Sequence, residues 1–174
     1  MRILVASLLL LTVILSSCKH DKNELILGEW YAQKFENKEM DAFFKESQAY
    51  IDTIGKNGND ATNMELYGAT NMDSIRHVLQ LQHDSAQTLQ MKAVTNTSFN
   101  FYSDSLVVIS FDGRMDTSKW RFVGEQKLEM EELTGSSKGS KTEIEVLQLT
   151  KSELKLKIEQ EKTFSTVTFG RDKK

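Results

Sequence analysis

Histidine, serine and cysteine most often bind metal ions or act as nucleophiles, and this chain holds few of them in useful patterns. Its histidines are His20, His77 and His83. Residues 77 and 83 are six apart, so a helix would point them to different faces rather than toward one metal ion. No G-x-S-x-G pattern marks a nucleophilic serine. We therefore expect solvent-exposed histidines, no metal site and no cofactor.

Five glutamates are a second candidate for chemistry, because paired carboxylates can act as general acid and base. They are Glu129, Glu131, Glu132, Glu143 and Glu145. They alternate with apolar residues in segments that also carry lysines, which indicates the outward face of strands. We interpret them as a solvated, ion-paired surface and predict that the protein is not an enzyme.

The single cysteine, Cys18, follows directly on an apolar run. Met1-Arg2 supplies positive charge, and residues 3–15 are almost all apolar. About thirteen such residues suit the hydrophobic region of an export signal, whereas a helix that crosses a membrane needs roughly twenty. We predict that residues 1–17 are a signal peptide. The mature chain then has no second thiol with which to form a disulfide.

Leu15-Ser16-Ser17-Cys18 resembles the bacterial lipobox, whose thiol receives a diacylglycerol before the signal is cleaved. The resemblance implies a lipoprotein with acyl chains such as palmitate on Cys18 and a short tether over residues 18–23. Two or more chains anchor a protein firmly. Lys19 stands where an Asp marks inner-membrane retention, which favours the outer membrane of a Gram-negative bacterium, on either face. The alternative is an ordinary signal peptide followed by a chance cysteine.

The remaining chain has the size and composition of one ordinary domain. Its 22 basic and 25 acidic residues leave a net charge of −3, which offers no basic surface for nucleic acid. Proline is absent, so no proline-rich linker divides the chain. We expect a single domain over residues 24–174.

A helical period appears only between residues 36 and 96. Its first part carries apolar residues at spacings of three and four: Met40, Phe43, Phe44, Tyr50, Ile51 and Ile54. Thr70-Asn71-Met72-Asp73 fits a capping box at the start of a second helix. That helix has the apolar stripe Met72, Ile75, Val78, Leu79, Ala86 and Leu89. We predict two amphipathic helices.

A period of two marks strands on both sides of this block. Leu25–Phe35 is rich in β-forming residues, and seven short alternating runs follow residue 97. Their bulky residues, expected to point inward, are Phe99, Phe101, Phe111, Trp120, Phe122 and Phe169. A meander of eight strands removes its edges by closing. We therefore predict a mainly β fold: an eight-stranded antiparallel up-and-down barrel, with a helical insertion over residues 36–96 between strands one and two.

Gly28-Glu29-Trp30, the meander and the C-terminal Gly170-Arg171 are similar to bacterial lipocalin-like lipoproteins, which are calycin-type barrels on a lipobox anchor. The resemblance implies that the guanidinium of Arg171 lies across Trp30 where the first and last strands meet. It also implies a small apolar or amphipathic ligand in the barrel. The helical insertion departs from lipocalins and is similar to the helix pair of fatty-acid-binding proteins.

Two functions follow from these expectations. In the first, the barrel holds a ligand and the helices cap its open end, with candidate ligand-binding residues Phe43, Phe44, Tyr50, Ile75, Leu79, Phe99, Phe101 and Trp120. In the second, the barrel is filled, and the protein is a structural or interaction lipoprotein that engages an envelope protein. A cavity of about 300 Å³ or more favours the first.

Four tripeptides of the form Asp-Ser/Thr-apolar resemble the sequon at which one group of Gram-negative bacteria O-glycosylates exported proteins. Their hydroxyl residues are Thr53, Ser74, Ser85 and Ser105. Helix capping and turn formation also favour Asp beside Ser or Thr, so both interpretations stand.

Overall fold

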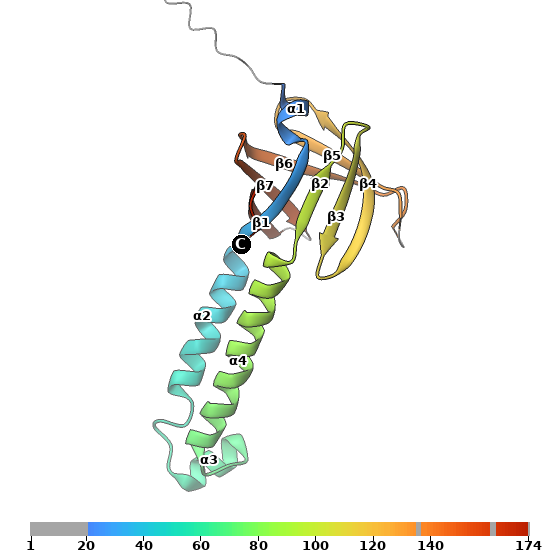
Figure 1. Ribbon diagram of the computed structural model, residues 1–174. Coiled ribbons are helices and arrows are strands. Elements are labelled where there is room, and N and C mark those ends of the chain that lie inside the picture. Colours follow the sequence, from blue (N-terminus) through green and yellow to red (C-terminus); the bar gives the residue numbers. More distant parts are fainter. Residues whose placement is uncertain (1–20, 135–136, 161–162, 174) are drawn as a thin grey trace, which may run out of the picture.

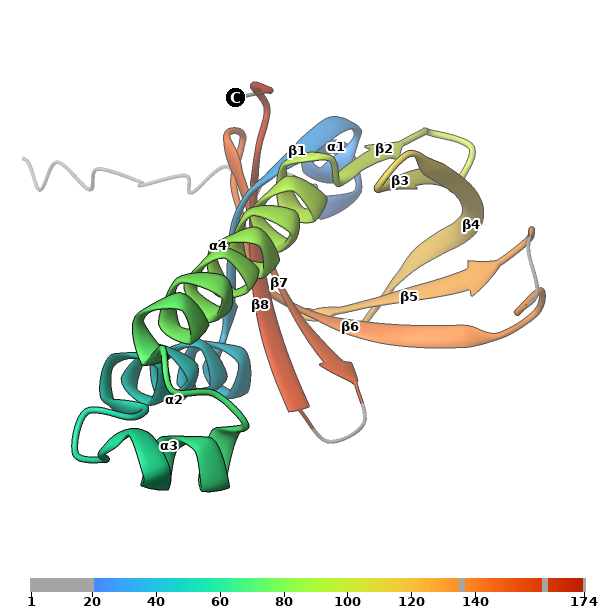
Figure 2. The same cartoon turned by 90° about the horizontal axis from the view of Figure 1, so that it is seen from below.

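The computed structural model describes residues 21–134, 137–160 and 163–173. The predicted signal peptide, Cys18 and His20 lie outside these residues. Eight antiparallel strands close into one barrel in sequence order, and three helices lie between the first and second strands (Figures 1 and 2). The predicted fold class is confirmed.

The elements have the following bounds. The strands are β1 (Gly28–Asn37), β2 (Ser98–Phe101), β3 (Leu106–Phe111), β4 (Arg114–Val123), β5 (Lys127–Glu132), β6 (Lys141–Leu149), β7 (Glu153–Gln160) and β8 (Thr163–Gly170). The helices are α1 (Lys22–Ile26), α2 (Lys38–Thr53), α3 (Asp60–Tyr67) and α4 (Met72–Thr95).

Strand β1 closes the barrel by pairing with both β2 and β8. The pairing with β2 ends at Tyr31, whereas the pairing with β8 continues to Asn37. A bulge between Ala32 and Lys34 interrupts the β8 ladder, and such a bulge bends its strand. β1 therefore reaches past β2 at the end of the barrel from which α2 leaves.

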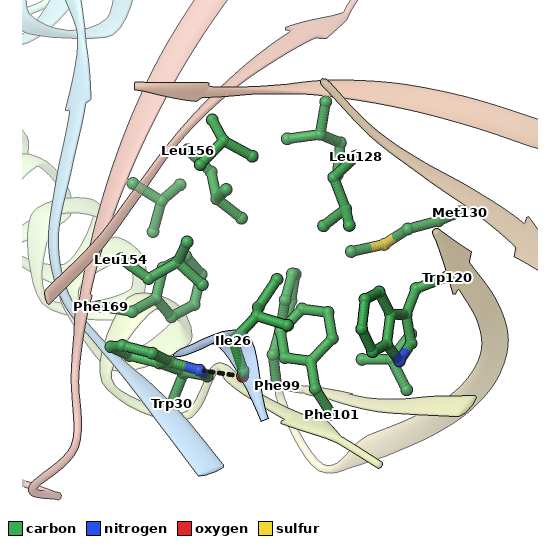
Figure 3. Close-up of a cluster of buried hydrophobic side chains, with 14 of the residues drawn as sticks. Ile26, Trp30, Phe99, Phe101, Trp120, Leu128, Met130, Leu154, Leu156 and Phe169 are labelled. Carbon is green, nitrogen blue, oxygen red and sulfur yellow. Dashed lines mark hydrogen bonds between the residues drawn. The ribbon is translucent and has the colours of Figure 1, made fainter. Parts of the chain in front are cut away.

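Alternate side chains of all eight strands point into the barrel and form one apolar core (Figure 3). Its largest fully buried members are Trp30, Phe101, Phe169, Ile26, Leu128, Leu154, Leu156 and Val107. Burial of a large apolar side chain contributes about 1.5–3 kcal/mol. Because Ile26 belongs to α1, this core fills the end of the barrel that α1 covers.

Ion pairs cover the outer face of β4 to β7. Arg121 lies 2.7 Å from Glu129, and Lys127 lies 2.7 Å from Glu143. Lys157 forms a third pair, 3.0 Å from the carboxylate of Glu145. The predicted ion-paired outer face is confirmed for Glu129, Glu131, Glu143 and Glu145. Glu132 instead follows the inward alternation of Leu128 and Met130, and it takes part in no ion pair among the described residues. Exposed pairs contribute little to stability, so the core rather than this face holds the barrel together.

Helices α2 and α4 run antiparallel and form a helical hairpin (residues 38–95) that projects from one end of the barrel, with α3 at its tip (Figure 1). α2 begins at Lys38 because the side chain of Asn37 accepts a hydrogen bond from the backbone N–H of Met40 at 2.8 Å. Asn71 caps α4 in the same way, accepting from the N–H of Ser74 at 3.1 Å.

Several local expectations are wrong. Leu25 and Ile26 belong to helix α1 rather than to the first strand, which begins at Gly28. The short helix α3 was not foreseen, because its residues carry no apolar stripe. The residue that caps α4 is Asn71, and the expected capping box at Thr70 does not form.

Phe111 was expected inside the barrel, but 54% of it is exposed. It is the last residue of β3, where the barrel wall ends, so the alternation that puts Val107 fully inside no longer buries this side chain. An inward direction therefore does not ensure burial at the rim.

Candidate functional site

One end of the barrel is sealed by α1 and by Arg171. The indole Nε1 of Trp30 donates a hydrogen bond to the carbonyl oxygen of Ile26 at 2.7 Å (Figure 3). The guanidinium carbon of Arg171 lies 3.5 Å from the centre of the Trp30 ring. Nη1 of Arg171 also donates to the carbonyl of Leu27 at 2.7 Å, and Nη2 donates to that of Leu25 at 2.8 Å.

The contact between Trp30 and Arg171 that the sequence predicts is thus present. Carbonyl groups at the end of a helix lack partners within the helix, and the guanidinium supplies donors for the carbonyls of Leu25, in the last turn of α1, and of Leu27, its C-cap. Partial burial lowers the pKa of Arg171 from its ordinary value. The seal is made by packing and hydrogen bonds, and this end of the barrel is closed by protein atoms.

The opposite end holds a barrel-mouth cavity of about 730 Å³. The interior strand residues that line it are Ala32, Phe35, Phe99, Ile109, Phe111, Ile158, Ser165, Val167 and Phe169. The base of the helical hairpin completes the wall with Met40, Phe43, Phe44, Ala86, Gln90, Ala93 and Val94, together with Thr97. The volume lies in the range of small-molecule sites.

The lining of this cavity is apolar. Phe99 and Phe169, with ring centres 5.0 Å apart, lie between the cavity and the filled core. The polar side chains in the lining are those of Gln90, Thr97 and Ser165, and no described residue in it is charged. Such a surface can hold a hydrocarbon or ring system and offers hydrogen bonds at a few points. It has no group suited to acid–base or metal chemistry.

The structure brings three of the eight candidate ligand-binding residues to this cavity: Phe43, Phe44 and Phe99. Phe101 is fully buried in the core, and Trp120 donates its indole N–H to the carbonyl of Leu106 at 3.1 Å, beside Phe101. Both therefore have structural surroundings rather than a place in the cavity wall.

Tyr50, Ile75 and Leu79 are not among the cavity-lining residues. They lie farther along the helical hairpin, which projects from the barrel instead of folding over it (Figure 1). The expectation that the whole insertion caps the open end is therefore wrong: only its base contributes to the wall. Two long helices joined at a distant tip reach the cavity only through the residues nearest the barrel, 40–44 on α2 and 86–94 on α4.

Most of the lining residues that the sequence did not single out come from β1, α4 and β8. Alternation on β8 could have identified Val167 as an inward residue near the open end. Phe35 could not be found in this way, because the bulge between Ala32 and Lys34 shifts the alternation of β1 by one residue. Ala86 belongs to the predicted apolar stripe of the second helix, whereas Ala93 carried no signal, because alanine on a helix commonly reflects only helix propensity.

A second hollow, the interhelical groove, has a volume of about 840 Å³ and lies beside the first. It runs between α2, α4 and β1 and is lined largely by polar residues: Gln33, Lys34, Asp41, Lys45, Gln48, Asp52, His83, Asp84, Gln87 and Thr95. Gln48 and Gln80 join the two helices by reciprocal amide hydrogen bonds of 2.9 and 3.1 Å.

His83 is 7% exposed, so its predicted solvent exposure is wrong. Its Nδ1 lies 3.3 Å from Oγ of Ser47, and its ring packs edge-on against Phe44 with 5.4 Å between the ring centres. His83 faces helix α2. The six-residue spacing between His77 and His83 shows only that the two histidines point to different faces, and not which face packs against another helix. The described residues contain no cluster of three His, Cys, Asp or Glu arranged to hold a metal ion.

The remaining candidate positions are distributed over the surface. Thr53, Ser74, Ser85 and Ser105 are all exposed. Thr53 donates its hydroxyl to the carbonyl of Ala49 at 2.8 Å, as a helix-terminal threonine often does. Cys18, the predicted lipid attachment site, lies outside the described residues. Within those residues, no helix is both long and apolar enough to cross a membrane.

Comparison with known proteins adds little to this picture. No protein-family model matches the chain, and no curated protein matches it. Among solved structures, the crystal structure of a DUF4847 family protein from Bacteroides vulgatus ATCC 8482 is similar to it. That protein is 11% identical, with a TM-score of 0.43 over 84% of this chain and 94% of that chain.

Proposed function

We propose that the protein is a non-enzymatic, lipid-anchored binding protein that holds a small apolar or amphipathic molecule in the barrel-mouth cavity. The observation that carries the proposal is the cavity itself. It has about 730 Å³ of space, an aromatic and aliphatic lining and three uncharged polar side chains. Protein interiors are normally filled with side chains, as the core near α1 is. A space of this size that side chains leave unfilled therefore supports a bound molecule.

The test is binding of the uncharged fluorescent probe N-phenylnaphthylamine to the purified domain from residue 21 onward. Ala93→Trp, which places an indole in the cavity wall, should weaken binding at least about tenfold. Ala42→Trp is the matched control, because Ala42 is exposed on α2 and does not line the cavity. Equal binding by the wild type and by Ala93→Trp, with both folded, would contradict the proposal.

The anchor is the second part of the proposal, and its support is the lipobox-like Leu15-Ser16-Ser17-Cys18. Asp21 and α1 lie at the end of the barrel away from the helical hairpin (Figure 1). Three residues span at most about 10 Å, so a lipid on Cys18 would hold the α1 end near the membrane. The barrel-mouth cavity would then face away from that membrane, in the cell envelope of a Gram-negative bacterium.

Metabolic labelling with a fatty acid tests the anchor. The wild-type chain should incorporate the label, and Cys18→Ser should not, because the thiol sulfur accepts the lipid. Ser17→Ala, which keeps a small residue before the cysteine, is the control and should stay labelled. Label on the Cys18→Ser protein would disprove the anchor without affecting the proposed cavity.

A second candidate function is interaction with an envelope protein through the helical hairpin. Large apolar side chains are exposed along it: Tyr50, Met64, Leu66, Val78, Leu81, Leu89 and Met91. Surfaces of this kind often mark interaction sites. A photocrosslinker at Leu81 in the native envelope should give one discrete adduct if this function is correct, whereas the same group at the exposed Lys151, on the β6–β7 turn, should not.

A further inference from the structure

The barrel-mouth cavity and the interhelical groove share part of their walls. Four residues line both hollows: Phe35, Phe44, Gln90 and Val94. They come from β1, α2 and α4, so the two hollows adjoin where the base of the helical hairpin meets the barrel. A molecule that fills the cavity therefore lies one side chain away from the groove.

The two hollows differ in their chemistry. The cavity has no charged lining residue among those described, whereas the groove is lined by Lys34, Lys45, Asp41, Asp52 and Asp84. An apolar compartment beside a charged one is the arrangement that an amphiphile needs. Its hydrocarbon part leaves water for the cavity, and its head keeps polar neighbours.

The charges of the groove favour a cation. Lys34 is paired with Glu36 at 2.7 Å, and Glu36 also lies 3.6 Å from Lys155, so two lysines share this carboxylate outside the groove. The groove lining carries three carboxylates, Asp41, Asp52 and Asp84, against two lysines, Lys34 and Lys45. None of the three carboxylates takes part in an ion pair within the described part of the chain. The groove as a whole is negative.

Two of these carboxylates are positioned by the amide pair that joins the helices. Gln48 donates to Oδ1 of Asp52 at 3.1 Å, and Gln80 donates to Oδ1 of Asp84 at 2.8 Å. Each carboxylate keeps further acceptor sites after one such bond. The ring of Phe44, which lines both hollows, adds an aromatic face of the kind that attracts ammonium groups.

We propose that the ligand is a single-chain amphiphile with a positively charged ammonium head. Its chain occupies the barrel-mouth cavity and its head lies in the interhelical groove, near Asp52 and Asp84. This inference rests on the proposed function, because it assigns a chemical class to the occupant of the same cavity.

The experiment measures displacement of N-phenylnaphthylamine by dodecylamine, dodecyltrimethylammonium, laurate and dodecanol, all below their micelle-forming concentrations. These compounds share one chain length and differ in the head. We expect both cations to displace the probe at concentrations at least about tenfold lower than laurate does. The preference should shrink as salt is added, because exposed charges are screened. Displacement of the probe by dodecylamine but not by dodecyltrimethylammonium would also support a cationic head, held by hydrogen bonds from its ammonium protons.

The double variant Asp52→Asn/Asp84→Asn tests where the head lies. It should reduce the preference for cations to within about threefold while leaving the affinity for N-phenylnaphthylamine unchanged. Asp60→Asn on α3 is the control, since Asp60 is exposed and does not line the groove, and it should keep the preference.

Equal displacement by dodecylamine and laurate, or a preference that survives in the double variant, would overturn the inference and leave the proposed function standing. Failure of every probe to bind, N-phenylnaphthylamine included, would overturn both.

Discussion

Arg171, one residue beyond the last strand, lies with its guanidinium carbon 3.5 Å from the ring centre of Trp30 on the first strand. The same side chain donates to the carbonyls of Leu25, Leu27 and Glu29. One residue thus joins the C-terminus of the barrel to α1 and to β1.

Replacing Arg171 with Ala should lower the free energy of unfolding by about 2–3 kcal/mol, because hydrogen bonds from a charged donor and a cation–π contact are lost together. Arg171→Lys should recover less than half of the loss, since an ammonium lacks the planar fork. Urea unfolding provides the measurement. Arg121→Ala, which removes only an exposed ion pair, is the control, and an equal loss there would contradict the special role of Arg171.

Gly28 provides a second test of the same seal. Its φ is +93°, and a Cβ added there would lie 3.0 Å from Nη1 of Arg171. Gly28→Ala should therefore destabilise the fold by about 1–3 kcal/mol through backbone strain and displacement of the guanidinium. Gly113→Ala is a matched control, because its φ is +81° but its Cβ would meet no atom within 4 Å. Thermal unfolding of both variants should show the larger loss at Gly28.

We expect the stability of the fold to depend on pH because of a carboxylate on the outer face of the barrel. The hydrogen bond from Arg121, more than any other influence, lowers the pKa of Glu129 below its ordinary value of 4.5. A carboxyl group with a lowered folded-state pKa contributes stability above its ordinary pKa, and that contribution disappears as the pH falls through the folded-state value. Stability should therefore decline below about pH 4.5.

Glu129→Gln should make that decline shallower, and Arg121→Gln should do the same by removing the partner. The two effects should not add in the double variant, because both act on one contact. Urea midpoints measured between about pH 7 and about pH 3 provide the comparison. An unchanged acid slope in Glu129→Gln would refute the assignment.

The helical hairpin should be dispensable for folding but not for binding. The test replaces residues 38–95 with a flexible linker of about six residues. A linker of this length spans the roughly 16 Å by which β1 extends past β2. The shortened barrel should keep its strand circular dichroism and bind N-phenylnaphthylamine at least about tenfold more weakly, because Met40, Phe43 and Ala86 leave the cavity wall.

Removal of the hairpin tip alone, residues 56–71, is the control for that deletion. It leaves the base of α2 and α4 in place and should preserve binding. Unchanged binding after the larger deletion would show that the hairpin base is no part of the site.

The sequence determined the barrel because each strand carries its own period. Alternation such as Leu154-Lys155-Leu156 specifies which face is buried, and eight such segments joined by short turns have few ways to remove their edges. The contact between Trp30 and Arg171 was also predicted at the sequence level, from the similarity of Gly28-Glu29-Trp30 and the C-terminal Arg171 to lipocalin-like proteins. The acidic and basic residues on the strands identified an ion-paired outer face for the same local reason.

The candidate site depended on information that no local pattern contains. An apolar stripe shows that a helix buries one face, but it does not show which element that face packs against. The direction in which the hairpin leaves the barrel decided that Phe43 lines the cavity and that Tyr50 does not. Small residues such as Ala93 line a cavity only because larger neighbours stop short of it. The burial of His83 likewise required the partner helix. Tertiary packing decided these features, because a cavity is a property of the space between elements and not of any one of them.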